Sequence, residues 1–137
     1  MIQRIQSIYL SLAAIAGVVF IFLPFGNINK EGKMIALNAL MNPIFCISII
    51  TISAFALISI FLFKNRKLQM RFVLLNILLS SLLLLVFIYG IYNHIQQDQL
   101  SPSFGVVLPL FMLLFNFLAY KGIQHDELLV KSMDRLR

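Results

Sequence analysis

Few residues in this chain could perform acid–base, nucleophilic or metal chemistry, and their spacing does not bring them together. The chain has one cysteine and two histidines. His94 and His125 flank an apolar segment, whereas a metal site needs clustered ligands. The sequence has no phosphate-binding glycine loop, no Ser-His-Asp set and no paired carboxylates in a concave site. We therefore expect no enzyme activity, no catalytic residue, no cofactor and no metal.

Cys46 stands alone and cannot form a disulfide within the chain. We interpret it as a small buried hydrophobic residue. A disulfide to another chain and a lipidated thiol are the alternatives.

The composition indicates a membrane protein. Apolar residues make up 61% of the 137 residues and charged residues 12%, against about 45–50% and about 25% in soluble domains. A small domain cannot hide that much apolar surface from water. Disorder is excluded too, because it needs low hydrophobicity and high charge.

Charged residues are absent from four stretches, 5–29, 34–63, 72–97 and 99–120. Each can hold one crossing helix of about 20 residues, and none can hold two. The predicted spans are 5–23, 44–63, 72–92 and 104–120, with a kink at Pro109 in the last. Apolar and polar residues do not alternate within these stretches, as they would in the strands of a membrane barrel. We expect an all-α, integral-membrane four-helix bundle over residues 1–120, followed by a tail helix over 121–137.

The distribution of basic residues predicts the orientation. With four crossings both termini lie on one side, and that side receives nine of the eleven Lys and Arg residues. They are Arg4, Lys64, Arg66, Lys67, Arg71, Lys121, Lys131, Arg135 and Arg137. Short basic loops stay in the cytoplasm, so we predict N-in and C-in threading in a bacterial inner membrane. Tyr92 and Tyr120 fall at predicted span ends, where aromatic rings favour the membrane interface.

The absence of ionisable residues from the spans excludes several function classes. A proton-coupled multidrug exporter needs a membrane-embedded carboxylate, and a dual-topology exporter would lack the charge bias. A quinone-linked disulfide-generating enzyme needs a cysteine pair. Basic and aromatic residues do not interleave as in nucleic-acid binders, so we expect no direct nucleic-acid partner.

Small polar residues recur at one depth of the spans. The predicted polar layer comprises Ser7, Ser11, Ser59, Asn76, Ser80 and Asn116. Small and amide side chains let membrane helices approach and bond to one another. The layer is interpreted as an internal network that fixes the bundle. Docking to another membrane protein and a polar pathway are the alternatives.

The two chain ends differ from the spans. Leu129, Met133 and Leu136 recur at helical spacing with Val130 beside them, which predicts an amphipathic tail helix. This helix either lies on the bundle or on lipid headgroups, or docks a partner protein. Predicted partner-binding residues are Gln3, Arg4, Gln6, Asp126, Glu127, Leu129, Val130, Lys131, Met133, Asp134, Arg135, Leu136 and Arg137. The N-terminal polar residues either start span one at the interface or contact the tail or the 64–71 loop. Outside the membrane, Asn27, Asn29 and Gly32 suggest that segment 26–42 is a loop.

The opening MIQRIQSIYL and the ending DELLVKSMDRLR resemble the two signature ends of a Bacteroidota family of small inner-membrane proteins, a domain of unknown function. Its members have four predicted membrane helices and a tail close to D-E-x-L-V-R/K-S-x-D-R-L-R. The match covers Met1 to Gln6 and Asp126, Glu127, Leu129, Val130, Lys131, Ser132, Asp134, Arg135, Leu136 and Arg137. Family members often have Ala at the position of Met133. The resemblance implies a bacterial inner membrane and a family-wide tail, but no activity.

The favoured functional hypothesis is a non-catalytic accessory or scaffolding subunit of a larger inner-membrane complex, which docks through its tail. A protein-translocation or insertion assembly is one possibility, and a respiratory assembly is another. The partners would be membrane lipids and other inner-membrane or cytoplasmic proteins. The alternatives are a homo-oligomeric channel or carrier with a polar path formed between subunits, and an organiser of anionic lipid.

Overall fold

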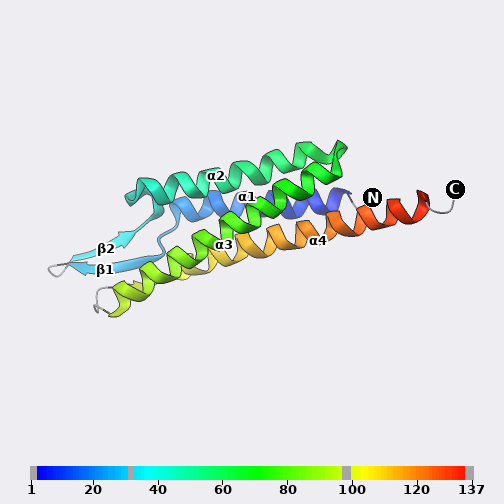
Figure 1. Ribbon diagram of the computed structural model, residues 1–137. Helices are drawn as coiled ribbons and strands as arrows, with labels where there is room; N and C mark the ends of the chain where they lie inside the picture. The colour runs from blue at the N-terminus through cyan, green and yellow to red at the C-terminus, as the bar shows by residue number, and fades with distance from the viewer. Residues whose placement is uncertain (1–2, 31–32, 97–99, 135–137) are drawn as a thin grey trace.

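The chain folds into four long helices that run side by side, with a small β-sheet at one end (Figure 1). The computed structural model describes residues 3–30, 33–96 and 100–134. The helices are α1 (Gln3–Phe22), α2 (Pro43–Phe61), α3 (Arg66–Gln96) and α4 (Leu108–Asp134). All four are long and apolar enough to cross a membrane. The predicted set of four membrane-length helices is therefore confirmed by length and composition.

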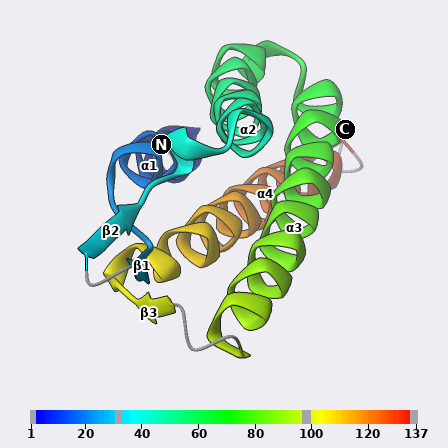
Figure 2. The same ribbon diagram turned by 90° about the vertical axis from the view of Figure 1, so that its left-hand side faces the viewer.

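The helices form a ring in which each packs against the next, and α4 closes the ring against α1 (Figure 2). Each connection reverses the chain direction, so the start of α1 and the end of α4 lie at the same end of the bundle (Figure 1). Helices α1 and α2 are about 30 Å long, and α3 and α4 are about 46 Å and 40 Å. The longer pair therefore exceeds a hydrocarbon core of about 30 Å.

Helix α4 contains both the end of the predicted fourth span and most of the predicted tail helix, because it continues through residue 120 to Asp134. Only Gly122 lies in that segment as a weak breaker, and a single glycine is tolerated inside a helix. Pro109 does not kink the helix, because a 3₁₀ turn (η3, Phe104–Val107) precedes α4 and places this proline in its first turn. Proline fits there, since the missing N–H would have no helical partner.

The start of α2 is determined by two adjacent residues, Asn42 and Pro43. The Asn42 side chain accepts hydrogen bonds from the backbone N–H groups of Ile44 and Phe45, at 3.2 and 3.4 Å. Pro43 occupies the first helical position. An Asn cap followed by proline satisfies the helix start and sets its backbone geometry. A 3₁₀ turn (η1, Ala39–Met41) leads into this cap, and another (η2, Leu62–Lys64) links α2 to α3.

The segment predicted as a loop contains strands instead. Strands β1 (Gly26–Lys30) and β2 (Lys33–Leu37) pair antiparallel, with Gly26 opposite Leu37. Strand β3 (Leu100–Pro102) pairs with the other edge of β1, which gives the order β2-β1-β3. Ile28 is buried between two asparagines, an alternation that suits a strand with one covered face. The fold is therefore a helical bundle with a small sheet closing one end, and the predicted all-α, four-helix class holds because these short strands are a minor addition to four long helices.

The core lies along the bundle axis in two main parts. The sheet end is filled by an aromatic cluster, Phe20, Phe25, Phe45 and Phe87, packed with Ile49 and Met112. The other end is filled by Leu10, Val73, Ala119 and Ile123. Large apolar side chains are also exposed along the outside of every helix. A helix that is apolar all round is typical of a membrane span.

Candidate functional site

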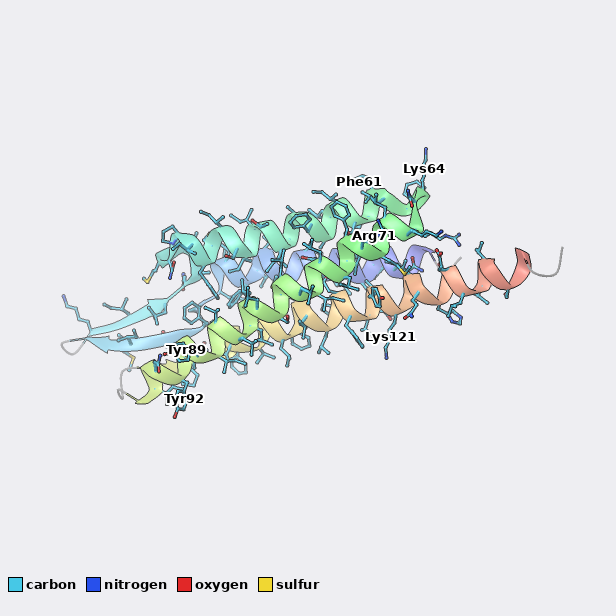
Figure 3. The ribbon with its side chains drawn as sticks, viewed as in Figure 1. Phe61, Lys64, Arg71, Tyr89, Tyr92 and Lys121 are labelled. Atoms are coloured by element: carbon cyan, nitrogen blue, oxygen red, sulfur yellow. The ribbon has the colours of Figure 1, made fainter. Side chains whose placement is uncertain are left out.

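The basic residues gather at the end of the bundle opposite the sheet, which we call the basic end. Lys64, Arg71 and Lys121 lie there, whereas Tyr89 and Tyr92 lie at the sheet end (Figure 3). Both tyrosines are exposed, as expected of rings at a membrane interface. The Lys121 ammonium lies 4.8 Å from the centre of the Phe117 ring, a cation–π contact. The two ends of the bundle therefore differ in charge and in side-chain type.

A buried hydrogen bond joins the start of α1 to the last part of α4. The Gln6 Nε2 donates to the Asp126 Oδ2 over 2.6 Å, and these residues are only 5% and 8% exposed. Gly122, one turn before Asp126, makes room, because a Cβ there would lie 3.0 Å from the Gln6 Cγ. The two segments that carry the sequence resemblance thus meet in space. We call this Gln6–Asp126 contact the latch.

The latch is supported from α3. The Arg66 Nη1 donates to the backbone carbonyl of Asp126 over 3.4 Å. This is a long contact for a hydrogen bond and therefore a weak one. It nevertheless places the guanidinium beside the acidic residue. Three helices therefore converge on Asp126, and the base of the tail is fixed to the bundle.

Gln69 is a buried residue that the sequence reasoning missed. Its Nε2 donates to the backbone carbonyl of Ser59 over 3.0 Å, and its side chain is 4% exposed. The last carbonyls of a helix have no intrahelical partner, and Ser59 lies within the last turn of α2. Gln69, at the start of α3, therefore provides a hydrogen-bond donor for a carbonyl at the end of α2. The only sequence signal was a lone amide between two apolar residues, Leu68 and Met70.

Two members of the predicted polar layer bond to each other across helices. The Asn76 Nδ2 donates to the Asn116 Oδ1 over 3.0 Å, which links α3 to α4 inside the bundle. The Asn116 Nδ2 also donates to the backbone carbonyl of Met112 over 2.9 Å. Both asparagines are fully buried. The structure thus brings these two predicted residues together.

The predicted serines bond within their own helices. Ser11, Ser59 and Ser80 each donate to a backbone carbonyl four residues earlier, on Ser7, Phe55 and Asn76. Such back-bonding is the usual solution for a serine hydroxyl in an apolar helix. Ser7 is half-buried on α1. Three of the predicted serines therefore bond within their own helices, whereas the Asn76–Asn116 bond joins two helices.

Helices α1 and α2 approach each other closely at two small residues, Gly17 and Ser53. A Cβ on Gly17 would overlap the Ser53 Oγ and would lie 3.0 Å from the Met112 Cε. Glycine removes this obstacle and lets the two helices touch. Ala13, Ala14 and Ala56 form a small buried cluster nearby.

The tail residues fall into three groups. Glu127 lies at the base of the tail and is half-buried, whereas Leu129 and Val130 are exposed beyond it. Lys131, Met133 and Asp134 belong to α4, and Gln3 and Arg4 to α1, but their side chains lie outside the description, as do Arg135, Leu136 and Arg137 altogether. Leu128, which was not singled out from the sequence, is 58% exposed.

Among residues 3–30, 33–96 and 100–134, no group of three or more His, Cys, Asp and Glu could hold a metal ion. Cys46 is half-buried and packs against the aromatic cluster. His125 is exposed. The features that stand out are the latch, the asparagine pair and the projecting tail.

Comparison with known proteins places the chain in a family. No curated protein and no solved structure matches it. The model of one family, the domain of unknown function DUF4293, matches residues 2–136. The match includes both segments that meet at the latch. The chain therefore belongs to the DUF4293 family.

Proposed function

We propose that the chain is a non-catalytic accessory or scaffolding subunit of a larger bacterial inner-membrane complex, and that it docks a partner through the end of α4. One observation carries this proposal. The last turns of α4 project past the ends of the other helices (Figure 1). Leu128, Leu129 and Val130 are all exposed there. Adjacent exposed apolar side chains mark contact sites for protein or membrane, and the projection of these turns past the other helices supports contact with a partner protein.

The latch supports the docking role. Asp126 is fixed to α1 by Gln6 and contacts Arg66 on α3. The projecting turns therefore continue from a base that is held in one direction. A helix presented in a fixed direction binds with a smaller loss of conformational freedom than a flexible tail.

The charge distribution supports the orientation. Lys64, Arg71 and Lys121 lie at the end from which the tail projects (Figure 3), and Arg66 and Lys67 belong to the first turn of α3 at that end. Short basic segments favour the cytoplasmic side, so the tail would point into the cytoplasm. A protein-translocation or insertion assembly fits a subunit of this kind, and the family resemblance suggests a Bacteroidota inner membrane.

The alternative of a channel formed between subunits gains no support from the polar residues. Asn76, Ser80 and Asn116 are buried inside one chain. They are therefore not available to line a path between subunits.

A native pull-down tests the proposal. The N-terminally tagged chain is solubilised in mild detergent, and co-purifying proteins are identified by mass spectrometry. The test variant carries Leu128→Asp and Leu129→Asp. The control carries Gln124→Asp and His125→Asp, which place the same charges at adjacent exposed positions of α4 before the latch residue Asp126. We expect a stoichiometric partner that the control retains and the test variant loses.

Two outcomes would contradict the proposal. A homo-oligomer without other proteins from all three chains would exclude an accessory subunit. A partner retained equally by both variants would exclude docking through the projecting turns.

A further inference from the structure

A hollow of about 340 Å³ lies between α3 and α4 at the basic end. It is lined by Lys67, Met70, Arg71, Leu74, Tyr120 and Glu127. The α3 residues recur at three- and four-residue spacing, and the two α4 residues are seven apart. Residues at these spacings share one helix face. The hollow is therefore built from one face of each helix and is separate from the latch.

The Asn76–Asn116 bond fixes the relative height of the lining residues. Because α3 and α4 run antiparallel, residues equally far from this bond lie level. Arg71 and Tyr120 are five and four residues from it, so they lie at similar depth. Lys67 and Glu127 lie further toward the basic end. The hollow thus has a deeper part, with Arg71 and Tyr120, and an outer rim.

The lining combines cations with apolar side chains at the height of a membrane interface. Lys67 and Arg71 are exposed, and Arg71 lies in the same region as Lys64 and Lys121 (Figure 3). Phosphate is recognised by lysine and arginine, and arginine binds it through two donors. Leu74 lies one turn deeper than Arg71 and is exposed. A ligand with a phosphate and a hydrocarbon chain would fit both the cations and the apolar side chains of this lining.

We propose that this hollow binds one anionic phospholipid of the adjoining leaflet. Lys67 and Arg71 contact its phosphate, the Tyr120 hydroxyl donates to a phosphate or ester oxygen, and an acyl chain lies on Met70 and Leu74. The proposal depends neither on the side of the membrane nor on a docked partner.

Lipid retention measured by native mass spectrometry tests this site. The full chain in detergent is titrated with phosphatidylglycerol or phosphatidylcholine. Charge-assisted hydrogen bonds to phosphate are directional, so only cations that line the hollow can make them. Replacing Lys67 and Arg71 with Gln should therefore weaken phosphatidylglycerol retention about 150-fold, which corresponds to about 3 kcal/mol for the two contacts. The control, Lys64→Gln with Lys121→Gln, removes the same charge outside the hollow and should retain the lipid.

Three results would overturn the proposal. Equal loss in both double variants would mean a diffuse surface attraction and no site. Equal retention of the two lipids by the unchanged chain would remove the preference for an anionic headgroup. Glycerol 3-phosphate offers the phosphate without acyl chains, and its retention as strongly as the lipid would exclude a role for Met70 and Leu74. Melting of each variant without lipid separates a lost site from a lost fold.

Discussion

The two ends of the bundle are held together by different interactions. At the sheet end four phenylalanines contact one another, with ring centroids between 5.3 and 6.2 Å apart. Strand β1 adds backbone bonds to β2 and β3 on either side. The basic end has a smaller buried cluster of Leu10, Val73, Ala119 and Ile123, and single side-chain hydrogen bonds from Gln6, Arg66 and Gln69 hold the helix termini there. The sheet end therefore combines the larger cluster with paired strands, whereas the basic end combines a smaller cluster with separate hydrogen bonds.

This difference indicates which end opens more easily. In lipid the association of helices depends on close packing, because the acyl chains are as apolar as the side chains. A ring cluster contributes many such contacts at once, whereas a hydrogen bond between membrane helices contributes about 0.6–2 kcal/mol. Local opening concentrates where few contacts hold an element. We therefore expect the basic end, which carries the projecting helix, to open first.

The largest effect is expected from breaking the sheet end. Phe87 contacts the rings of Phe20, Phe25 and Phe45 and is 6% exposed. Phe87→Ala should lower the free energy of unfolding by about 3–5 kcal/mol, because it removes packing and leaves a cavity. Unfolding by denaturant in detergent measures the change.

Tyr89→Ala serves as the control, because Tyr89 lies on the same helix and is 68% exposed. Its replacement should cost much less. Equal losses for the two variants would mean that the ring cluster does not stabilise the sheet end.

A smaller and more local effect is expected from opening the latch. Gln6→Ala leaves the buried Asp126 side chain without its Gln6 donor, which costs about 1–3 kcal/mol. Hydrogen exchange should speed up in α4 after Gly122, while β1 and β2 keep their protection. Asp126→Asn retains an acceptor for Gln6 and should cost less. Faster exchange throughout the chain would show that the two ends are not independent.

The asparagine pair between the two ends should contribute about 1 kcal/mol. A double-mutant cycle with Asn76→Leu and Asn116→Leu measures its coupling. Each single change leaves one buried amide without its partner, so the double variant should lose less stability than the two losses added together. Strictly additive losses would mean that the bond seen between these side chains adds no stability.

The four helices could be predicted from the sequence because their signal repeats over many residues. A stretch of 20 or more residues without charge is typical of a membrane helix along its whole length. Pro24 ends the first helix because proline does not fit a helix interior, and Asn42 and Pro43 start the second as cap and first residue. The pairing of the two asparagines could also be predicted from the placement of the helices. Once the helices are placed, Asn76 and Asn116 fall at the same depth.

The sheet and the latch depend on long-range partners that the sequence does not reveal. Strand β3 has three residues and pairs with β1 across most of the chain, so its local pattern is too short to predict it. Asn27 and Asn29 also favoured a loop, because asparagine is common in turns. A contact between the N-terminal polar residues and the tail was one interpretation of the sequence, and the Gln6–Asp126 bond agrees with it. Which two side chains meet depends on the packing of α1 against α4, because these residues are 120 positions apart.

The smallest effect on stability is expected just beyond the latch. Ile123 is fully buried beside Leu10, whereas Leu128 is 58% exposed on the same helix. Leu128→Ala should change the free energy of unfolding by less than about 0.5 kcal/mol, because surface substitutions rarely do more. Ile123→Ala should cost about 2–5 kcal/mol. If Leu128→Ala destabilised the isolated chain as much as Ile123→Ala does, Leu128 would belong to the packed bundle. Docking of a partner through the end of α4 would then lose its basis.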